Sequence, residues 1–244
     1  MFKALLAVGF AIALTFASAQ TLTGQYDCAP AGAYTLCQNL WGEDNGVGSQ
    51  NSTLISTSGN TISWSTTYTW ANNPNDVKSY ANVLSNTAKG MTLSAVRAAP
   101  TTWQWEYESK SSGLRADVSY DIWFGTAPSG DPATSASSYE IMIWLSQRGG
   151  IQPVGSKILS GISVAGHTWN LYEGPNSNWE TYSFVSADGD IRDFRADLKD
   201  FFDYLVENEG VSDSQYLQAI QTGTEPFTGS ATLNVESFSV AVNV

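Results

Sequence analysis

Apolar and polar residues alternate with a period of two along most of the chain. Such alternation, in short runs separated by Gly, Asn, Ser and Pro, predicts β-strands. Interleaved Thr, Ser and Tyr indicate that many strands keep one face in water, which is typical of antiparallel sheets. The runs lie at 32–42, 51–70, 101–109, 114–125, 139–146, 157–166, 167–174, 179–187 and 231–244.

One segment, residues 190–210, follows a helical period instead. Its first turn is acidic, and Gly210 is a typical stop signal. We therefore expect an all-β sandwich with one amphipathic α-helix packed against it. The apolar positions with this helical spacing are Ile191, Phe194, Leu198, Phe201, Phe202, Leu205 and Val206.

The strand at 137–146 carries a glutamate, Glu140, in a run that otherwise predicts a buried strand. Because side chains alternate across a strand, Glu140 shares a face with Met142 and Trp144, while Tyr139, Ile141, Ile143 and Leu145 form the other. The second set predicts a packed core. A carboxylate beside a thioether and an indole is costly in a sealed core, so the first set indicates a partly wet groove.

The first 19 residues have the pattern of a secretory signal peptide. Lys3 precedes an apolar run that ends in the small residues Ala17-Ser18-Ala19, and this run is too short to span a membrane. We expect a secreted, extracellular protein whose mature chain, residues 20–244, forms a single domain. No later stretch is apolar for long enough to cross a bilayer.

Charge and aromatic content narrow the choice of ligand. The formal net charge of −12 becomes −13 without Lys3, which disfavours nucleic acid and anionic membranes as partners. Only 14% of the residues are charged, whereas Trp, Tyr and Phe number 9, 11 and 10. Aromatic side chains stack on the apolar faces of sugar rings, so the composition favours a neutral carbohydrate.

Cysteine and histidine are scarce. In a secreted chain, Cys28 and Cys37 predict one disulfide that links the two strands of a hairpin. No cysteine cluster indicates a metal, and His167 is the only histidine, in a loop-like stretch. We therefore expect neither a metal nor another cofactor, and we disfavour a Ser-His-Asp triad.

A second glutamate, Glu225, stands in the uncharged stretch QTGTEPFTGS, where Pro226 favours an extended backbone before it. A single glutamate in a strand is more often a structural residue than a catalyst. Two carboxyl groups can hydrolyse a glycosidic bond, and a separation of about 5–5.5 Å implies retention through a covalent intermediate. At that distance two charges repel by roughly 3 kcal/mol, enough to keep one carboxyl protonated under mildly acidic conditions.

Several motifs resemble those of glycoside hydrolase family 12, the small fungal and bacterial endoglucanases and xyloglucanases. Their order is that of the family, and YEIMIWL with GTEPFTG is the most specific combination. The matching stretches are QNLWG (38–42), DVKSY (76–80), ADVSYDIWF (116–124), YEIMIWL (139–145), TYSFV (181–185), DFFDYLVENEG (200–210) and GTEPFTG (223–229).

The resemblance implies a jelly-roll β-sandwich of two curved antiparallel sheets with an open substrate cleft. By position in the motifs, Glu140 corresponds to the nucleophile and Glu225 to the acid/base. Asp121 corresponds to the aspartate that sets the protonation of the nucleophile. Trp41 corresponds to a sugar-stacking tryptophan with Asn39 beside it, and Met142 and Trp144 are expected on the cleft floor. The implied substrate is a β-glucan chain, and we expect a monomer.

The chain departs from the family in its cysteines. Many members bridge two positions that are Thr23 and Asn51 in this sequence, so Cys28 and Cys37 form a different pair. Asn51 also begins the sequon Asn51-Ser52-Thr53, which predicts a glycosylation site.

Two alternatives concern function. The first is a carbohydrate-binding lectin on the same fold, against which both intact glutamate motifs argue. The second concerns substrate: 171–176 and 206–217 resemble xyloglucanases, whereas 151–157 and 125–138 resemble general glucanases. The sequence alone favours broad endo-β-1,4-glucanase activity that includes xyloglucan, with a xyloglucan-specific enzyme as the alternative.

Overall fold

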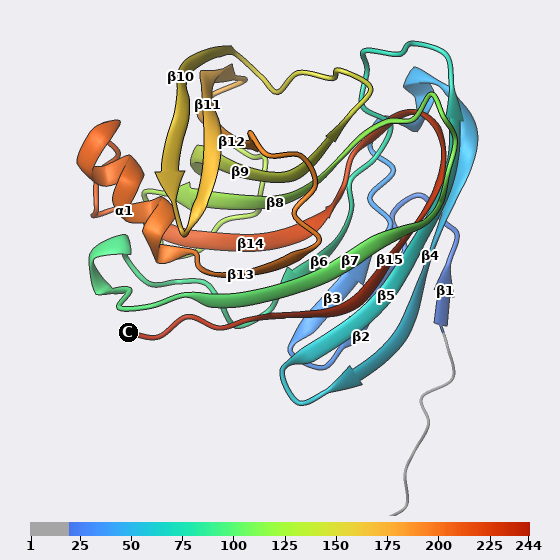
Figure 1. Cartoon of the computed structure of the whole chain (residues 1–244). Helices are drawn as coiled ribbons and strands as arrows, with labels where there is room; N and C mark the ends of the chain where they lie inside the picture. Colours follow the sequence, from blue (N-terminus) through green and yellow to red (C-terminus); the bar gives the residue numbers. More distant parts are fainter. Residues whose placement is uncertain (1–19) are drawn as a thin grey trace, which may run out of the picture.

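The computed structural model describes residues 20–244, so the expected signal peptide lies outside the described residues. Two curved sheets form most of the structure (Figure 1). In spatial order, the first sheet consists of β1 (Gln20–Leu22), β4 (Val47–Ser58), β5 (Thr61–Ala71), β15 (Pro226–Val240), β7 (Pro100–Lys110) and β13 (Asp193–Asp197). The second sheet consists of β2 (Cys28–Ala31), β3 (Tyr34–Cys37), β6 (Ala81–Ser85), β14 (Tyr216–Thr224), β8 (Arg115–Gly125), β9 (Ser137–Arg148), β12 (Trp179–Ser186), β11 (His167–Asn176) and β10 (Ser156–Val164).

The sheets meet where the chain passes from β14 to β15. Glu225 is the only residue between these strands, and the start of β15 pairs with β8 of the second sheet before the strand continues in the first. The predicted antiparallel sandwich is confirmed, with one exception in its pairing: β9 and β12 run parallel. Two short 3₁₀ turns, η1 (Glu43–Asn45) and η2 (Leu93–Ala95), lie in the connections.

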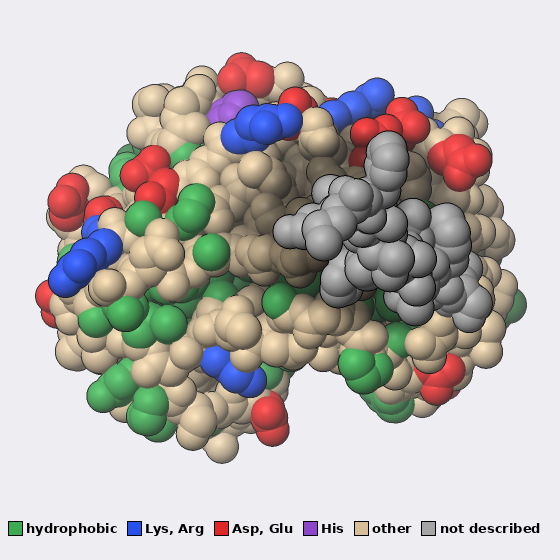
Figure 2. Space-filling view, turned by 90° about the horizontal axis from the view of Figure 1, so that it is seen from below, with side chains coloured by type: hydrophobic (Ala, Val, Ile, Leu, Met, Phe, Trp, Pro, Cys, Tyr) green, Lys and Arg blue, Asp and Glu red, His purple; other side chains and the backbone are tan. Residues whose placement is uncertain are grey.

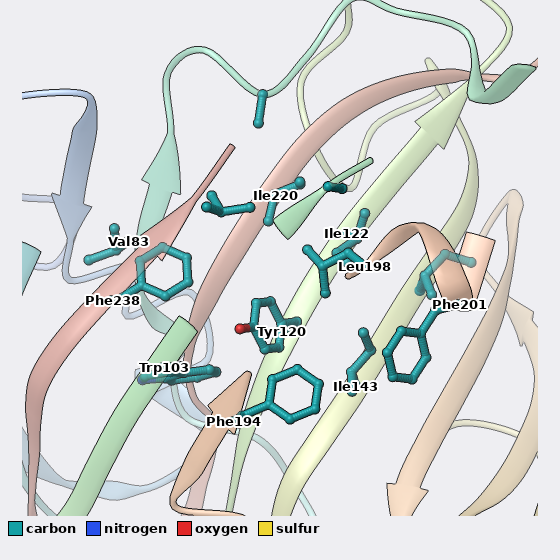
Figure 3. Packing of buried hydrophobic residues seen from close by; sticks show 14 of the residues in the cluster. Val83, Trp103, Tyr120, Ile122, Ile143, Phe194, Leu198, Phe201, Ile220 and Phe238 are labelled. Atoms are coloured by element: carbon teal, nitrogen blue, oxygen red, sulfur yellow. The ribbon is translucent and has the colours of Figure 1, made fainter. Parts of the chain in front are cut away.

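The core fills the space between the two sheets. Trp103 and Phe238 of the first sheet face Tyr120 of the second, and the rings of Trp103 and Tyr120 meet edge to face at 5.0 Å (Figure 3). Ile141 and Ile143 of β9 belong to the same buried cluster. The prediction that one face of this strand packs in the core is therefore confirmed. The opposite face, which carries Glu140, points away from the core.

The prediction of one long helix at 190–210 is wrong in its first half. Residues Asp193–Asp197 form strand β13, which pairs with β7, and only Lys199–Asn208 form the helix α1. Phe194 is fully buried opposite Trp103 while Arg195 is exposed, so this stretch follows the strand period rather than the helical one.

The start of α1 depends on Asp197. Its Oδ1 accepts the backbone N–H groups of Ala99 and Lys199, which attaches the turn to a neighbouring segment. The helix buries Phe201 and Phe202 in the main core, against Phe184 and Phe124 respectively. It ends before Gly210, whose φ of 74° agrees with the predicted stop signal.

The predicted hairpin and disulfide are both present. Strands β2 and β3 pair antiparallel with Cys28 opposite Cys37, and the two sulfur atoms are bonded. We expect Cys28→Ser/Cys37→Ser to lose about 2–3 kcal/mol of stability, since a cross-link over a separation of 9 residues restricts the unfolded chain.

This loss corresponds to a fall of roughly 5–10 °C in the midpoint of thermal unfolding. Calorimetry with and without a reductant is the measurement, because reduction should destabilise the wild type but not the variant. Equal unfolding midpoints for the wild type and the variant in the absence of reductant would contradict the expectation.

The surface carries its charges unevenly. On the face seen in Figure 2, Lys, Arg, Asp and Glu lie mainly near the edges of the visible part, and the middle is uncharged. Asn51 of the expected sequon lies in β4, where its side chain is partly exposed. Within residues 20–244, no helix is both long and apolar enough for a membrane span.

Candidate active site

A cleft of about 730 Å³ lies on the face of the second sheet that points away from the core. Its charged lining residues are three carboxyl groups, Asp121, Glu140 and Glu225, and no lysine or arginine of residues 20–244 lines it. Amide side chains such as Asn39, Asn82 and Gln221 supply further polar groups. Its aromatic lining residues are Tyr26, Trp41, Tyr80, Trp123, Trp144, Trp179 and Phe227. The cleft therefore suits a neutral, polyhydroxylated ligand.

Glu140 is held by three hydrogen bonds to a single carboxylate oxygen. Its Oε2 accepts from Asn176 Nδ2 at 3.1 Å, Trp179 Nε1 at 3.0 Å and Thr181 Oγ1 at 2.7 Å. These donors fix the orientation of the carboxyl group. Among the described residues none donates to the other oxygen, Oε1, which leaves that atom free to react.

The three donors to Glu140 are candidate functional residues that the sequence did not indicate. Thr181 lies directly opposite Glu140 across the parallel β9–β12 pair. Asn176 is the last residue of β11, Trp179 is the first residue of β12, and the two are paired with each other. Thr181 begins the motif TYSFV, and Asn176 ends LYEGPN. The motifs mark the segments, but they do not indicate which side chain reaches the glutamate.

Asp121 lies on β8 opposite Met142, diagonal to Glu140 on the same face. The pKa of Asp121 is raised well above its usual value. Burial is the larger cause, and the negative charge of Glu140 is the second. A neutral Asp121 beside an ionised Glu140 avoids repulsion between two buried charges. The structure thus brings these two predicted residues together in one cleft.

Glu225 occupies the bend between β14 and β15, so its backbone position depends on both strands. Its N–H donates to Asp117 Oδ1 at 3.0 Å, and its carbonyl oxygen accepts the N–H of Asp117 at 3.2 Å. The pKa of Glu225 is raised well above its usual value. Burial is the largest cause, and the negative charges of Asp117, Asp121 and Glu140 add to it. A carboxyl group with a raised pKa therefore lines the cleft together with the hydrogen-bonded carboxyl group of Glu140.

The other predicted site residues also line the cleft. Trp41 is 50% exposed, so its indole is available for stacking, whereas Met142 and Trp144 are almost fully buried. Trp144 donates from Nε1 to the sulfur of Met142 at 3.5 Å. Asn39 lies nearby in a left-handed backbone conformation, with φ of 47°.

Histidine takes no part in this cleft. The ring of His167 packs against Trp169 and Phe194, at 6.0 and 5.5 Å between ring centroids. It lies at the start of β11, and it is absent from the cleft lining. Its position agrees with the view that the chemistry does not depend on a histidine triad.

Comparisons with known proteins agree on one family. The model of glycosyl hydrolase family 12 matches residues 32–243. A xyloglucan-specific endo-β-1,4-glucanase A from Emericella nidulans is 45% identical over 239 residues, which cover 94% of this chain and 96% of the relative.

Two solved structures share the fold. The catalytic domain of Humicola grisea Cel12A, in complex with a soaked thio cellotetraose, has a TM-score of 0.85 and 37% identity, with 92% of this chain and 99% of that chain covered. Endoglucanase 3 of Trichoderma harzianum, from family GH12, has a TM-score of 0.85 and 38% identity, with 93% and 99% covered.

Proposed function

The chain belongs to glycosyl hydrolase family 12, and from this premise we propose that it is a retaining endo-β-1,4-glucanase that cuts xyloglucan. The observation that carries the proposal is the pair formed by Glu140 and Glu225 in a cleft where, among the described residues, Asp121 is the one other charged side chain. One carboxylate is held by donors, and the other carboxyl has a raised pKa, which is the division of roles that glycoside hydrolysis needs.

In the first step, Glu140 attacks the anomeric carbon of the substrate through Oε1 and forms a covalent glycosyl-enzyme. Glu225 gives its proton to the oxygen of the leaving sugar, so the departing group leaves as a neutral alcohol. The hydrogen bonds from Asn176, Trp179 and Thr181 keep Oε2 in place during the attack.

In the second step, the ionised Glu225 takes a proton from water, whose oxygen attacks the same anomeric carbon. The bond to Glu140 breaks, and the configuration is retained after two inversions. Glu225 is protonated again at the end, which restores the starting state. Asp121 remains neutral beside Glu140 and limits the charge in the cleft.

The glucan chain binds along the aromatic lining of the cleft. Trp41 offers an exposed indole on which a sugar ring stacks, and Asn39 supplies an amide next to it. Met142 and Trp144 form the apolar floor beside Glu140. The thio cellotetraose bound to the Humicola grisea protein supports a β-glucan as the class of ligand.

Xyloglucan is the preferred substrate in this proposal. The sequence alone favours broad activity, but the curated relative at 45% identity is named as xyloglucan-specific, and so is one from Aspergillus aculeatus at 44%. The solved relatives named above, Cel12A and endoglucanase 3, are 37% and 38% identical. Because the identity to the xyloglucan-specific relatives is higher, we favour xyloglucan as the preferred substrate.

The test measures new reducing ends and viscosity with xyloglucan and with unbranched β-1,4-glucan, using the wild type and Glu140→Gln. We expect a rapid fall in viscosity of xyloglucan, a slower reaction with the unbranched chain, and neither with the variant. Faster cutting of unbranched glucan would support the general endoglucanase instead. Binding of both polymers without any new reducing ends would support the lectin.

We also propose that the mature protein is secreted and monomeric. The signal pattern at 1–19 and the disulfide in residues 20–244 support export to an oxidising compartment. The same export would bring Asn51 to the glycosylation machinery. Mass spectrometry of the secreted protein identifies both its first residue and any sugar on Asn51.

A further inference from the structure

Asp117 is a buried carboxyl group that the two-step mechanism above does not use. It lies on β8 with its side chain fully buried, in the motif ADVSYD. Its Oδ1 accepts from the backbone N–H of Glu225 at 3.0 Å and from Ser119 Oγ at 3.1 Å. An ionisable group at this depth requires a partner for each oxygen.

The backbones of Asp117 and Glu225 are also bound to each other. The N–H of Asp117 donates to the carbonyl oxygen of Glu225 at 3.2 Å, and Thr224 Oγ1 donates to the carbonyl oxygen of Asp117 at 2.6 Å. Together with the bond to Oδ1, these contacts fix the bend that carries Glu225. Asp117 is therefore part of the same structural unit as the acid/base.

The other oxygen of Asp117, Oδ2, lacks an N–H or O–H donor among the described groups. The side chain of Glu225 is close enough to that of Asp117 for each carboxyl group to shift the pKa of the other. Two carboxylates cannot form a hydrogen bond, so one of the pair must carry a proton. A single proton, carried by Glu225, allows Glu225 to donate a hydrogen bond to the buried carboxylate of Asp117.

We infer that Asp117 is a positioning residue whose ionised carboxylate accepts a hydrogen bond from protonated Glu225 and so holds one proton between the two groups. The inference rests on the acid/base role of Glu225 proposed above. When Glu225 gives its proton to the leaving oxygen, two buried negative charges remain side by side. Their repulsion makes Glu225 a stronger base for the water of the second step.

The pair holds a single proton at pH values between the pKa values of the two groups. Burial raises the pKa of Asp117 to about 7, and the hydrogen bonds it accepts oppose that rise. For Glu225, burial and then the charge of Asp117 raise the pKa. Lys78 of the adjacent segment does not neutralise the pair, because its Nζ donates to the carbonyl oxygens of Asn73 and Asp76.

Other titratable groups surround the pair from neighbouring elements and belong in any account of its pH dependence. They are Tyr68 on β5, Tyr80 before β6, Tyr107 on β7, Asp121 on β8 and Glu140 on β9. Burial raises the pKa of Tyr68, Tyr80 and Tyr107, so they stay neutral near neutral pH. Asp121 is neutral in the mechanism above, so Glu140 is the group in this set that adds negative charge.

The test is a carboxyl ¹³C NMR titration of Glu225 in the protein labelled on glutamate, with the signal assigned by its loss in Glu225→Gln. In Asp117→Asn, the amide oxygen can still accept from the Glu225 N–H, but the side chain carries no charge. We expect the titration midpoint of the Glu225 carboxyl to fall by about one to two pH units. An unchanged or raised midpoint would overturn the inference.

Two further variants make this result specific. Ser119→Ala removes a donor to Asp117 and destabilises its ionised form, so we expect a smaller fall in the Glu225 midpoint. Asp190→Asn is the matched control, because Asp190 is paired with Arg148 and is not a cleft residue. If Asp117→Asn does not fold, an unchanged midpoint in Ser119→Ala overturns the inference instead.

This experiment separates the inference from the proposed function. The titration uses free enzyme and needs no turnover. Hydrolysis by Glu225→Gln at the wild-type rate would defeat the proposed acid/base role, whatever the titration shows. An unchanged titration in Asp117→Asn would defeat the role of Asp117 and leave the function intact.

Discussion

Glu140→Gln is expected to lower kcat on xyloglucan by about 10⁴-fold or more, the scale of loss when a covalent hydrolase is deprived of its nucleophile. The amide keeps the size of the side chain and an oxygen that can accept from Thr181, but it cannot form the glycosyl-enzyme. Because sugar contacts elsewhere in the cleft are unchanged, oligosaccharide binding should persist. Initial rates and calorimetric titration with a xyloglucan oligosaccharide measure the two effects.

A second variant identifies the role of Glu140 directly. In Glu140→Ala, azide can enter the space left by the carboxylate and attack an aryl glycoside whose leaving group needs no acid. The product is a glycosyl azide of inverted configuration. The matched control is Glu106→Gln, an exposed glutamate on β7 in the other sheet, which should leave the rate unchanged. A rate for Glu140→Gln within tenfold of the wild type would contradict the nucleophile role.

Glu225→Gln is expected to lower kcat/KM on xyloglucan by roughly 10²- to 10⁴-fold, the range of general acid catalysis. The loss should shrink for aryl glycosides with increasingly acidic leaving groups, since these depart without a proton. A series of such glycosides, measured on both proteins, gives the dependence on leaving-group pKa. We expect a steep dependence for the variant and a shallow one for the wild type.

The pH profile provides a second measurement on the same variant. The raised pKa of Glu225 means that the wild type keeps its catalytic proton up to higher pH and loses activity as pH rises through that pKa. In Glu225→Gln this alkaline limb should disappear for activated glycosides. Glu236→Gln, an exposed change on β15, is the control. An alkaline limb that survives in Glu225→Gln would assign it to another group.

Local patterns in the sequence predicted much of the fold. The strand at 139–146 was correctly divided into a core face and a cleft face, because alternation in a strand depends only on neighbouring residues. The hairpin closed by Cys28 and Cys37 was predicted for a similar reason. The helical period at 190–210 was misleading at its start, since pairing with β7 overrode the local pattern there.

Tertiary structure decided how the candidate site is assembled. The sequence singled out Glu140 and Glu225 individually, and the family motifs suggested their roles. Thr181 reaches Glu140 from 41 residues away because β9 and β12 pair in parallel, and no local period encodes a parallel partner. Asp117 was predicted only as part of a strand.

The sequence by itself thus determined which residues of the strand at 139–146 face the cleft, since the period of a strand is a local property. Only the tertiary structure decided which groups surround each carboxyl, and therefore which carboxyl keeps its proton. Burial and the charge of Asp117 act on Glu225 across 108 positions of the chain. Such effects depend on distance in space, which the fold sets and the order of residues does not show.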